Sequence, residues 1–248
     1  MKKFFILITF QLIAFCIFSQ DKIHEASEAY TEGKYEQAVE IYEALLSEKG
    51  ESAAIYYNLG NCYYRLNKTP LAILNYERAH LLSPGDDDIN INLEMARLKA
   101  TDRIASVDTF FMTRWIEALR DLGSTNEWSY WAIFSFLFFI TSLFMFFFGR
   151  RLILKKVGFY AGLFFLAFCI LSNIFAYQQK NKLIDRTYAI VFTPTVALKS
   201  SPDKSGTDLF VLHEGAKVKI LGSLGEWSEI QIADGNKAWI QTIHFQQI

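Results

Sequence analysis

The sequence predicts a multidomain membrane protein, made of an all-α helical-repeat module, a two-helix transmembrane hairpin and a small all-β barrel. Three observations predict this fold class. Small and aromatic residues near the N-terminus recur with a spacing of 34 residues, as Ala38 and Ala72 do. Two stretches of 21 residues in the middle contain no charged side chain. Short alternating apolar segments bounded by turn residues fill the C-terminal part.

The composition is typical of a membrane protein with soluble parts. Aromatic residues make up 16% of the chain, and their excess is concentrated in the two uncharged stretches, where lipid would be the solvent. A net charge of -1 supplies no field that draws a protein to phosphate backbones, so nucleic acid is not expected as a partner. The three cysteines, Cys16, Cys62 and Cys169, fall in different segments and do not predict a disulfide.

Residues 1–20 have the pattern of a signal peptide. Lys2 and Lys3 precede an apolar run over residues 4–18, which is short for a membrane span. Two alternatives remain open, namely cleavage near Ser19 and retention as an N-terminal anchor. Either one exports the residues that follow, so we expect residues 21–100 in the periplasm.

Residues 128–148 and 157–177 are each predicted to form a transmembrane helix, because 21 residues of helix span about 31 Å. The loop between them, residues 149–156, carries four cations and no acid, which favours a cytoplasmic position. A hairpin in the inner membrane therefore leaves both flanking modules on the periplasmic side. No ionisable residue lies within either span, which disfavours an ion or proton path.

Gly158 and Gly162 form a GxxxG pair in the second span, a pattern that lets another helix approach closely. The docking helix is either the first span or a helix of a partner protein. The alternative is that the two glycines are simply tolerated in lipid.

Residues 21–100 predict paired helices with a capping helix at residues 89–99. Besides the alanine pair, Tyr42 and Tyr76 are 34 residues apart. The second copy resembles the tetratricopeptide (TPR) consensus at its signature positions: Tyr56, Leu59, Gly60, Tyr63, Ala72, Tyr76, Ala79 and Pro84. The resemblance implies a concave groove that accepts a peptide or partner helix.

The TPR resemblance implies that five residues are partner-binding: Tyr57, Asn58, Asn61, Tyr64 and Arg65. Asn61 and Arg65 are four positions apart, so they share a helix face and suit a peptide backbone or carboxylate. The alternative for each of them is a solvated helix face without a ligand.

Residues 101–127 predict an amphipathic juxtamembrane linker. Its apolar residues have helical spacing: Phe110, Phe111, Met112, Trp115, Ile116 and Leu119. This face lies either on the membrane surface or against the end of the repeats. A second linker is expected over residues 178–186.

Residues 187–248 predict a small barrel with strands at 189–192, 195–199, 217–221, 227–232 and 237–241. Gly215, Asp234 and Gly235 with the two tryptophans resemble a bacterial SH3-like (SH3b) domain. We expect Trp227 and Trp239 to fill the core. The alternative is that one exposed tryptophan edge binds a ligand, since related domains are often linked to cell-wall or peptide binding.

The order of these modules resembles the BatE-like proteins of the Bat group, which is associated with aerotolerance in Bacteroides-type bacteria. The resemblance implies an envelope complex whose partners include Bat proteins with von Willebrand factor A domains, besides membrane lipid and peptidoglycan or peptide. No cofactor or metal is expected.

The sequence does not predict an enzyme. Its four histidines have no HExxH spacing, and no nucleophile with a base or phosphate-binding loop is present. We therefore expect a non-enzymatic, membrane-anchored scaffold. The alternative is a cell-wall-associated enzyme or a hydrolase accessory subunit that the SH3b domain targets.

Overall fold

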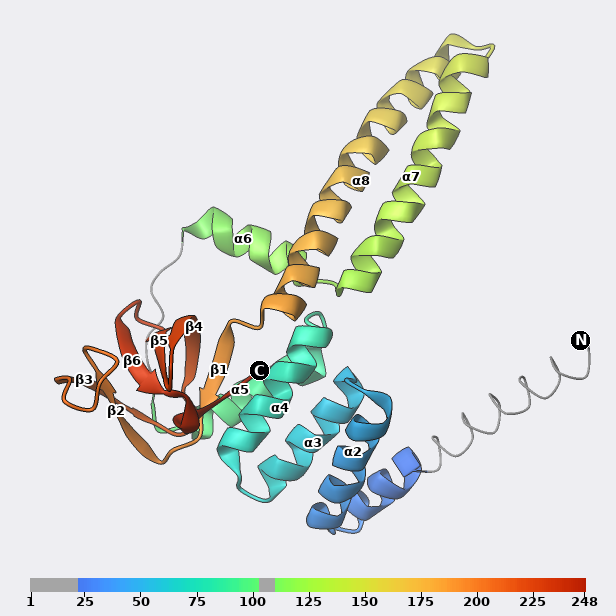
Figure 1. Ribbon diagram of the computed structural model, residues 1–248. Coiled ribbons are helices and arrows are strands. Elements are labelled where there is room, and N and C mark those ends of the chain that lie inside the picture. Colours follow the sequence, from blue (N-terminus) through green and yellow to red (C-terminus); the bar gives the residue numbers. More distant parts are fainter. Residues whose placement is uncertain (1–21, 103–109) are drawn as a thin grey trace, which may run out of the picture. The chain divides into compact units, whose positions relative to one another are not determined.

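A computed structural model describes residues 22–102 and 110–248 (Figure 1). The expected signal peptide, with Cys16, lies outside the described residues. The chain divides into two compact units. The first contains the described residues of Met1–His80, Asp86–Val107 and Thr187–Ile248, and the second contains those of Leu81–Gly85 and Asp108–Arg186.

The N-terminal part of the first unit is a series of paired helices. They are residues 22–31, α2 (Tyr35–Lys49), α3 (Ala53–Arg65), α4 (Thr69–Leu82) and α5 (Asp87–Lys99) (Figure 1). The residues that define the 34-residue period lie in the core: Ala38 and Ala72 are fully buried, and Tyr42 and Tyr76 are nearly so. The predicted helical repeat is therefore confirmed.

Two positions show why the sequence pairs these helices. A Cβ atom on Gly60 would lie 2.5 Å from the ring of Tyr76, so α3 and α4 approach closely only because Gly60 is glycine. Asp86 is the N-cap of α5, where its carboxylate accepts from the backbone N–H groups of Asp88 and Ile89. Asp86 thus satisfies two backbone N–H groups at the start of α5. The acidic residues of the first turn also complement the positive end of the helix dipole.

The C-terminal part of the first unit is one antiparallel sheet in the order β3-β2-β6-β5-β4-β1-β7. Its strands are β1 (Tyr188–Val191), β2 (Thr195–Lys199), β3 (Asp208–His213), β4 (Lys217–Leu224), β5 (Trp227–Gln231), β6 (Lys237–Gln241) and β7 (Phe245–Gln247). The five expected strands are present. The two that the sequence did not predict, β3 and β7, end the strand order, where exposed positions blur the alternation of apolar and polar residues.

The expectation that Trp227 and Trp239 fill the barrel core is wrong. Aliphatic residues form most of that core: Ala189, Val191, Val196, Leu198, Leu212, Ala216, Val218, Ile230, Ile232, Ala238 and Ile240. Successive strand residues point to opposite faces, and Ile230 and Ile240 point inward. The two tryptophans lie in the alternate positions, half-buried on the outer face.

The second unit contains α6 (Phe111–Arg120), α7 (Thr125–Phe148) and α8 (Leu152–Asp185). Helices α7 and α8 form a hairpin, and both are long and apolar enough to cross a membrane (Figure 1). Only 17% and 22% of their most apolar windows are buried. Such low burial is unlike the core helices of a soluble protein, which hide most of their apolar surface.

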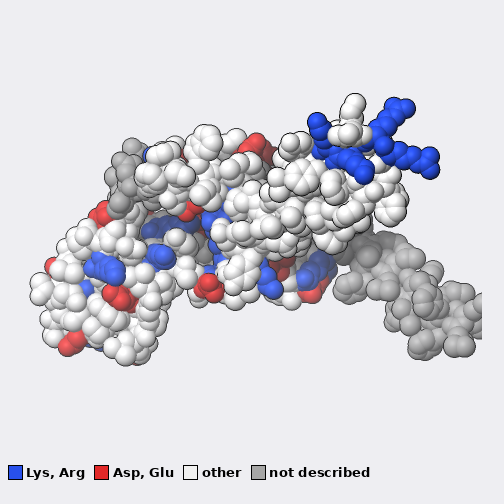
Figure 2. Space-filling view, turned by 90° about the horizontal axis from the view of Figure 1, so that it is seen from above, with Lys and Arg blue, Asp and Glu red and all other residues white. Residues whose placement is uncertain are grey.

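Helix α8 is longer than the predicted span at both ends. It includes residues 152–156 of the expected loop and residues 178–185 of the expected linker, so both predictions are corrected. Hydropathy identifies only the apolar part of a helix. The charged residues at both ends of α8 also favour helix, so the helix is longer than its apolar part. Basic side chains gather at the closed end of the hairpin (Figure 2), where Arg150, Arg151, Lys155 and Lys156 occur without an acid.

Candidate partner-binding groove

A pocket of about 260 Å³ lies on the helical repeat. Residues of four helices line it: Tyr30, Asn61, Tyr64, Arg65, Tyr76, Asn92 and Met95. Tyrosine rings and a methionine provide apolar walls, while two amides and a guanidinium provide hydrogen-bonding groups. Such a lining can contact both apolar and polar groups of a ligand.

A hydrogen bond between the side-chain amides of Asn61 and Asn92 fixes their orientation in the pocket. Asn61 Oδ1 accepts from the hydroxyl of Tyr76 at 2.7 Å and from Asn92 Nδ2 at 2.9 Å. Asn92 Nδ2 also donates to the hydroxyl of Tyr57 at 3.0 Å. Burial raises the pKa of Tyr76, which keeps its hydroxyl a donor. Asn61 Oδ1 and Asn92 Nδ2 thus each already make two hydrogen bonds. A ligand can still accept a hydrogen bond from the Asn61 NH₂ group and donate one to the Asn92 side-chain carbonyl.

Two cations flank this amide pair. Arg65 Nε donates to the hydroxyl of Tyr30 at 3.4 Å, and its side chain is otherwise exposed. Lys99 Nζ lies 3.6 Å from the centre of the Tyr64 ring, a cation–π contact. The rim of the pocket therefore favours a ligand with an acidic side chain or a carboxylate.

Three of the five predicted partner-binding residues, Asn61, Tyr64 and Arg65, line the pocket. Tyr57 lies next to it through its hydrogen bond with Asn92, and Asn58 is half-buried and does not line it.

Sequence reasoning missed Tyr30, Asn92 and Met95, although the 34-residue period contains a signal that identifies Tyr30 and Met95. Tyr30 is one period before Tyr64, and Met95 is one period after Asn61. Equivalent positions of stacked repeats line the same groove.

The helix-docking pair on α8 faces α7. A Cβ atom on Gly158 would lie 2.8 Å from the backbone nitrogen of Phe146 and from the carbonyl oxygen of Ser142. A Cβ atom on Gly162 would lie 3.5 Å from Ser142 Cβ. The structure therefore places α7, rather than a helix of another protein, against both glycines.

The repeat and the barrel meet at a buried carboxylate within the first unit. Glu77 on α4 is only 2% exposed, and it pairs with Arg97 of α5 at 2.6 Å and with Lys217 of β4 at 2.7 Å. Burial alone would raise the pKa of Glu77, but the charges and hydrogen bonds of Lys217 and Arg97 outweigh it and lower the pKa to about 2. Glu77 is therefore ionised at neutral pH and links the two modules.

Further contacts surround this ion pair. Both the backbone N–H and the ring Nδ1 of His213 hydrogen-bond to the carboxylate of Asp102, at 2.6 and 2.8 Å. Gly215 has a φ of +86°, and a Cβ atom there would lie 3.2 Å from Ile73 and 3.3 Å from Ala100. The turn between β3 and β4 is thus one part of the barrel that fits against α4 and the end of α5.

Comparison with known families agrees with the geometry of the first unit. Residues 24–87 match the family described as tetratricopeptide repeat, and residues 194–242 match the bacterial SH3 domain. The chain carries a TPR array and a bacterial SH3 domain. The TPR array holds the pocket, and the SH3b domain carries the outward-facing tryptophans.

Two curated relatives match less than a third of this chain. Tetratricopeptide repeat protein 16 of Macaca fascicularis and that of Homo sapiens are each 27% identical over 74 residues. These residues are 30% of this chain and 8% of either relative.

Two solved structures of the Yersinia enterocolitica type III secretion chaperone SycD are also similar to part of the chain. One holds a peptide of the translocator YopD, and the other is an alternative dimer. They are 21% and 22% identical, and they cover 32% and 33% of this chain and 61% of their own. Both TM-scores are 0.32, a value too low to support an argument about fold or ligand.

Proposed function

We propose that this chain is a non-enzymatic, membrane-anchored scaffold that binds envelope proteins through its TPR groove and its SH3b domain. TPR and SH3b domains are interaction modules, so a role in protein–protein interaction follows from the domains themselves. The pocket is the observation that carries the finer proposal, because it combines aromatic walls, a fixed amide pair and the guanidinium of Arg65, with Lys99 against the ring of Tyr64.

The groove would hold an extended peptide segment by its backbone. Asn61 would donate to a peptide carbonyl and Asn92 would accept from a peptide N–H, since their other groups already bond to each other. Arg65 would pair with an acidic side chain or a terminal carboxylate of that segment. Backbone recognition provides affinity, and the cation selects for acidic segments.

The contact between the TPR array and the SH3b domain supports their location on the same side of the membrane. Glu77 precedes the transmembrane hairpin in the sequence and Lys217 follows it, yet their side chains form an ion pair. An even number of membrane crossings between them is consistent with that pair. We infer that both modules face the periplasm, with the basic end of the hairpin in the cytoplasm. The module order further supports a role in a Bat-type aerotolerance complex.

Photo-crosslinking in native membranes tests the groove. A benzoylphenylalanine at Tyr64 should crosslink to a partner protein, whereas the same group at Gln37, an exposed residue of α2 that does not line the pocket, should not. The double variant Asn61→Ala/Arg65→Ala should abolish the Tyr64 crosslink. The matched control Gln37→Ala/Glu40→Ala also removes one amide and one charge and should leave the crosslink unchanged. An unchanged crosslink in the groove variant refutes the assignment.

The outer face of the SH3b sheet favours a second candidate, a hydrolase accessory subunit that binds the cell wall. Trp227 and Trp239 lie diagonally on neighbouring strands of this face, and Lys199 of β2 is opposite Trp239. Two half-exposed indole rings beside a cation suit a sugar or peptide of the cell wall.

Sedimentation with purified peptidoglycan tests this second candidate. Trp227→Ala/Trp239→Ala should lose co-sedimentation, and Leu224→Ala, which truncates an exposed apolar residue of β4, should retain it. Equal binding by all three proteins, or none by the unaltered chain, refutes the wall-binding role.

A further inference from the structure

Helix α6 has one strongly apolar face that the rest of the described chain leaves uncovered. The residues of this face, from Phe110 just before the helix to Leu122 just after it, are each 46–74% exposed: Phe110, Phe111, Met112, Trp115, Ile116, Leu119 and Leu122. No residue of α6 is buried in the described structure. Arg114 and Glu117 occupy the opposite face, as expected for a helix at the boundary between water and an apolar phase.

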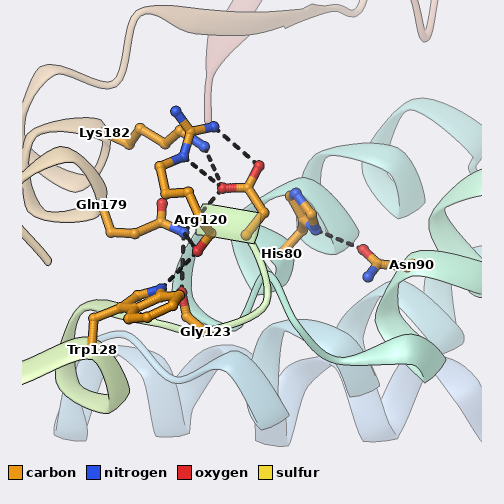
Figure 3. A network of polar contacts seen from close by, with 8 residues as sticks. His80, Asn90, Arg120, Gly123, Trp128, Gln179 and Lys182 are labelled. Atoms are coloured by element: carbon orange, nitrogen blue, oxygen red, sulfur yellow. Dashed lines mark hydrogen bonds and ion pairs between the residues drawn. The ribbon is translucent and has the colours of Figure 1, made fainter. Parts of the chain in front are cut away.

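A polar cluster fixes the C-terminal end of α6 to α8 (Figure 3). Gln179 Nε2 lies within 3.2 Å of three acceptors, which are the carbonyl oxygens of Arg120 and Gly123 and the carboxylate of Asp121. Asp121 also pairs with Lys182 at 2.8 Å and with Arg120 at 2.9 Å. Gln179 is only 4% exposed, so these bonds are shielded from water. The cluster therefore prevents α6 from swinging freely about its connection to α7.

The same cluster continues into the start of the first span. Trp128 Nε1 donates to the carbonyl oxygen of Arg120 at 2.7 Å, and the Trp128 ring packs edge-on against Phe175 of α8. Ser124 and Glu127 form a capping box that starts α7 directly after α6. Figure 1 shows α6 running across the end of the hairpin rather than along it.

The depth of α6 follows from its neighbours along the chain. Tyr130, Trp131 and Tyr177 are more than half exposed near the same end of the hairpin, where a membrane-spanning pair carries its interfacial aromatic residues. Only a few residues separate α6 from this aromatic level. The fixed end of α6 thus lies close along the chain to the lipid-facing surface of the spans.

We propose that α6 lies in the plane of the membrane surface, with its apolar face in the boundary between headgroups and acyl chains, held there by the Gln179–Asp121 cluster. This inference rests on the proposed membrane hairpin. The occupant of the apolar face is lipid, because the described chain leaves the face uncovered and the cluster fixes one end of α6 to the spans. The helix carries two cations and one acid, so neutral lipid suffices for binding.

Spin labels on the full-length chain in phosphatidylcholine vesicles test this placement. Cys16 and Cys169 are replaced by Ala, whereas Cys62 remains because it is fully buried and burial raises its pKa to about 12, which keeps it unreactive. One cysteine is then introduced at a time. Met112→Cys reports the apolar face and Glu117→Cys the polar face. The background protein without an introduced cysteine controls for labelling of Cys62.

The label at Met112 should collide several-fold more with oxygen, which concentrates in lipid, than with a water-soluble nickel chelate. The label at Glu117 should show the reverse preference. Leu119→Cys is a second apolar-face site, so the result does not depend on one substitution. An Ile140→Cys label, at an exposed position of α7, independently reports whether the hairpin contacts lipid.

The outcomes separate the two proposals. Oxygen preference at Ile140 with nickel access at Met112 and Leu119 overturns only the α6 inference. Shielding of Met112 and Leu119 from both reagents means that protein covers the face, which also overturns it. Nickel access at Ile140 overturns the membrane hairpin and the α6 inference with it.

Discussion

Removing the carboxylate of Glu77 should loosen the contact between the TPR array and the SH3b domain. Lowering the pKa of Glu77 from 4.5 to about 2 corresponds to about 3 kcal/mol, at ~1.4 kcal/mol for each pKa unit. Breaking a buried ion pair costs a similar ~3–5 kcal/mol. Arg97 and Lys217 remain 42% and 33% exposed, so water can solvate them once Glu77 is gone. We therefore expect Glu77→Gln to destabilise the first unit by about 2–3 kcal/mol.

Urea unfolding of the full-length chain in detergent, followed by tryptophan fluorescence, measures this loss. A double-mutant cycle with Lys217→Met isolates the part of the energy that crosses between the modules, and Arg97→Met isolates the part within the repeat. Contacting charges should give a coupling energy of about 0.5–3 kcal/mol between Glu77 and Lys217. Strict additivity of these two substitutions would refute the conclusion that this ion pair joins the modules.

The pH dependence gives an independent check with a defined sign. Because the pKa of Glu77 is lowered in the folded chain, its stabilisation is complete above the unfolded pKa near 4.5 and is lost as the pH falls towards 2. The unaltered chain should therefore lose more stability in this window than Glu77→Gln does. Parallel pH profiles for the two proteins contradict the assignment of an ionised Glu77.

Four further substitutions test the contacts between helices. Gly60→Ala places a methyl group 2.5 Å from the ring of Tyr76, and thermal unfolding in detergent should show a loss of about 1–3 kcal/mol. The Cβ atom of Gly158→Ala would lie 2.8 Å from backbone atoms of α7, so this substitution should cost a similar amount of stability. Gly162→Ala makes ordinary contacts and should change the stability by no more than about 0.5 kcal/mol. Equal effects of the two substitutions would contradict the close contact between α7 and α8. Gln179→Ala removes the shared donor of three acceptors, and spin-label distances between α6 and α8 should broaden; an unchanged distribution would show that the cluster does not restrain α6.

The modules were predictable because each has its own sequence period. The 34-residue repeat, the uncharged spans and the alternating strands follow from local packing rules. The full length of α8 was not predictable from hydropathy, since its two ends carry charged residues while remaining helical. Strand β3 was missed because Leu209 and Val211 are apolar yet exposed, which breaks the alternation.

The tryptophans show how an alternation can be overlooked. Large aromatic residues usually add mass to small cores, and this general tendency favoured Trp227 and Trp239 as core residues. The segment from Trp227 to Ile230 nevertheless alternates, so a buried Ile230 requires the opposite face for Trp227. The register of neighbouring strands, rather than residue size, decides which face is buried.

The candidate groove was only partly predictable, for a different reason. Asn61 and Arg65 follow from one repeat considered alone, but a groove exists only where repeats stack. Tyr30 and Met95 come from the flanking helices, and they become recognisable when the period is applied to the groove positions themselves. The hydrogen bonds that fix the amide pair depend on tertiary packing and have no sequence signal.

The groove and the contact with the SH3b domain use different sides of α4. Tyr76 lines the pocket, whereas the next residue, Glu77, binds Lys217 of the barrel. Adjacent positions on a helix point about 100° apart, so a peptide in the groove and the docked SH3b domain need not compete for the same surface. A Glu77→Gln variant should therefore retain the Tyr64 crosslink while its modules separate more easily. Loss of that crosslink would instead show that docking of the barrel shapes the groove, and the scaffold would then act as one binding surface rather than two.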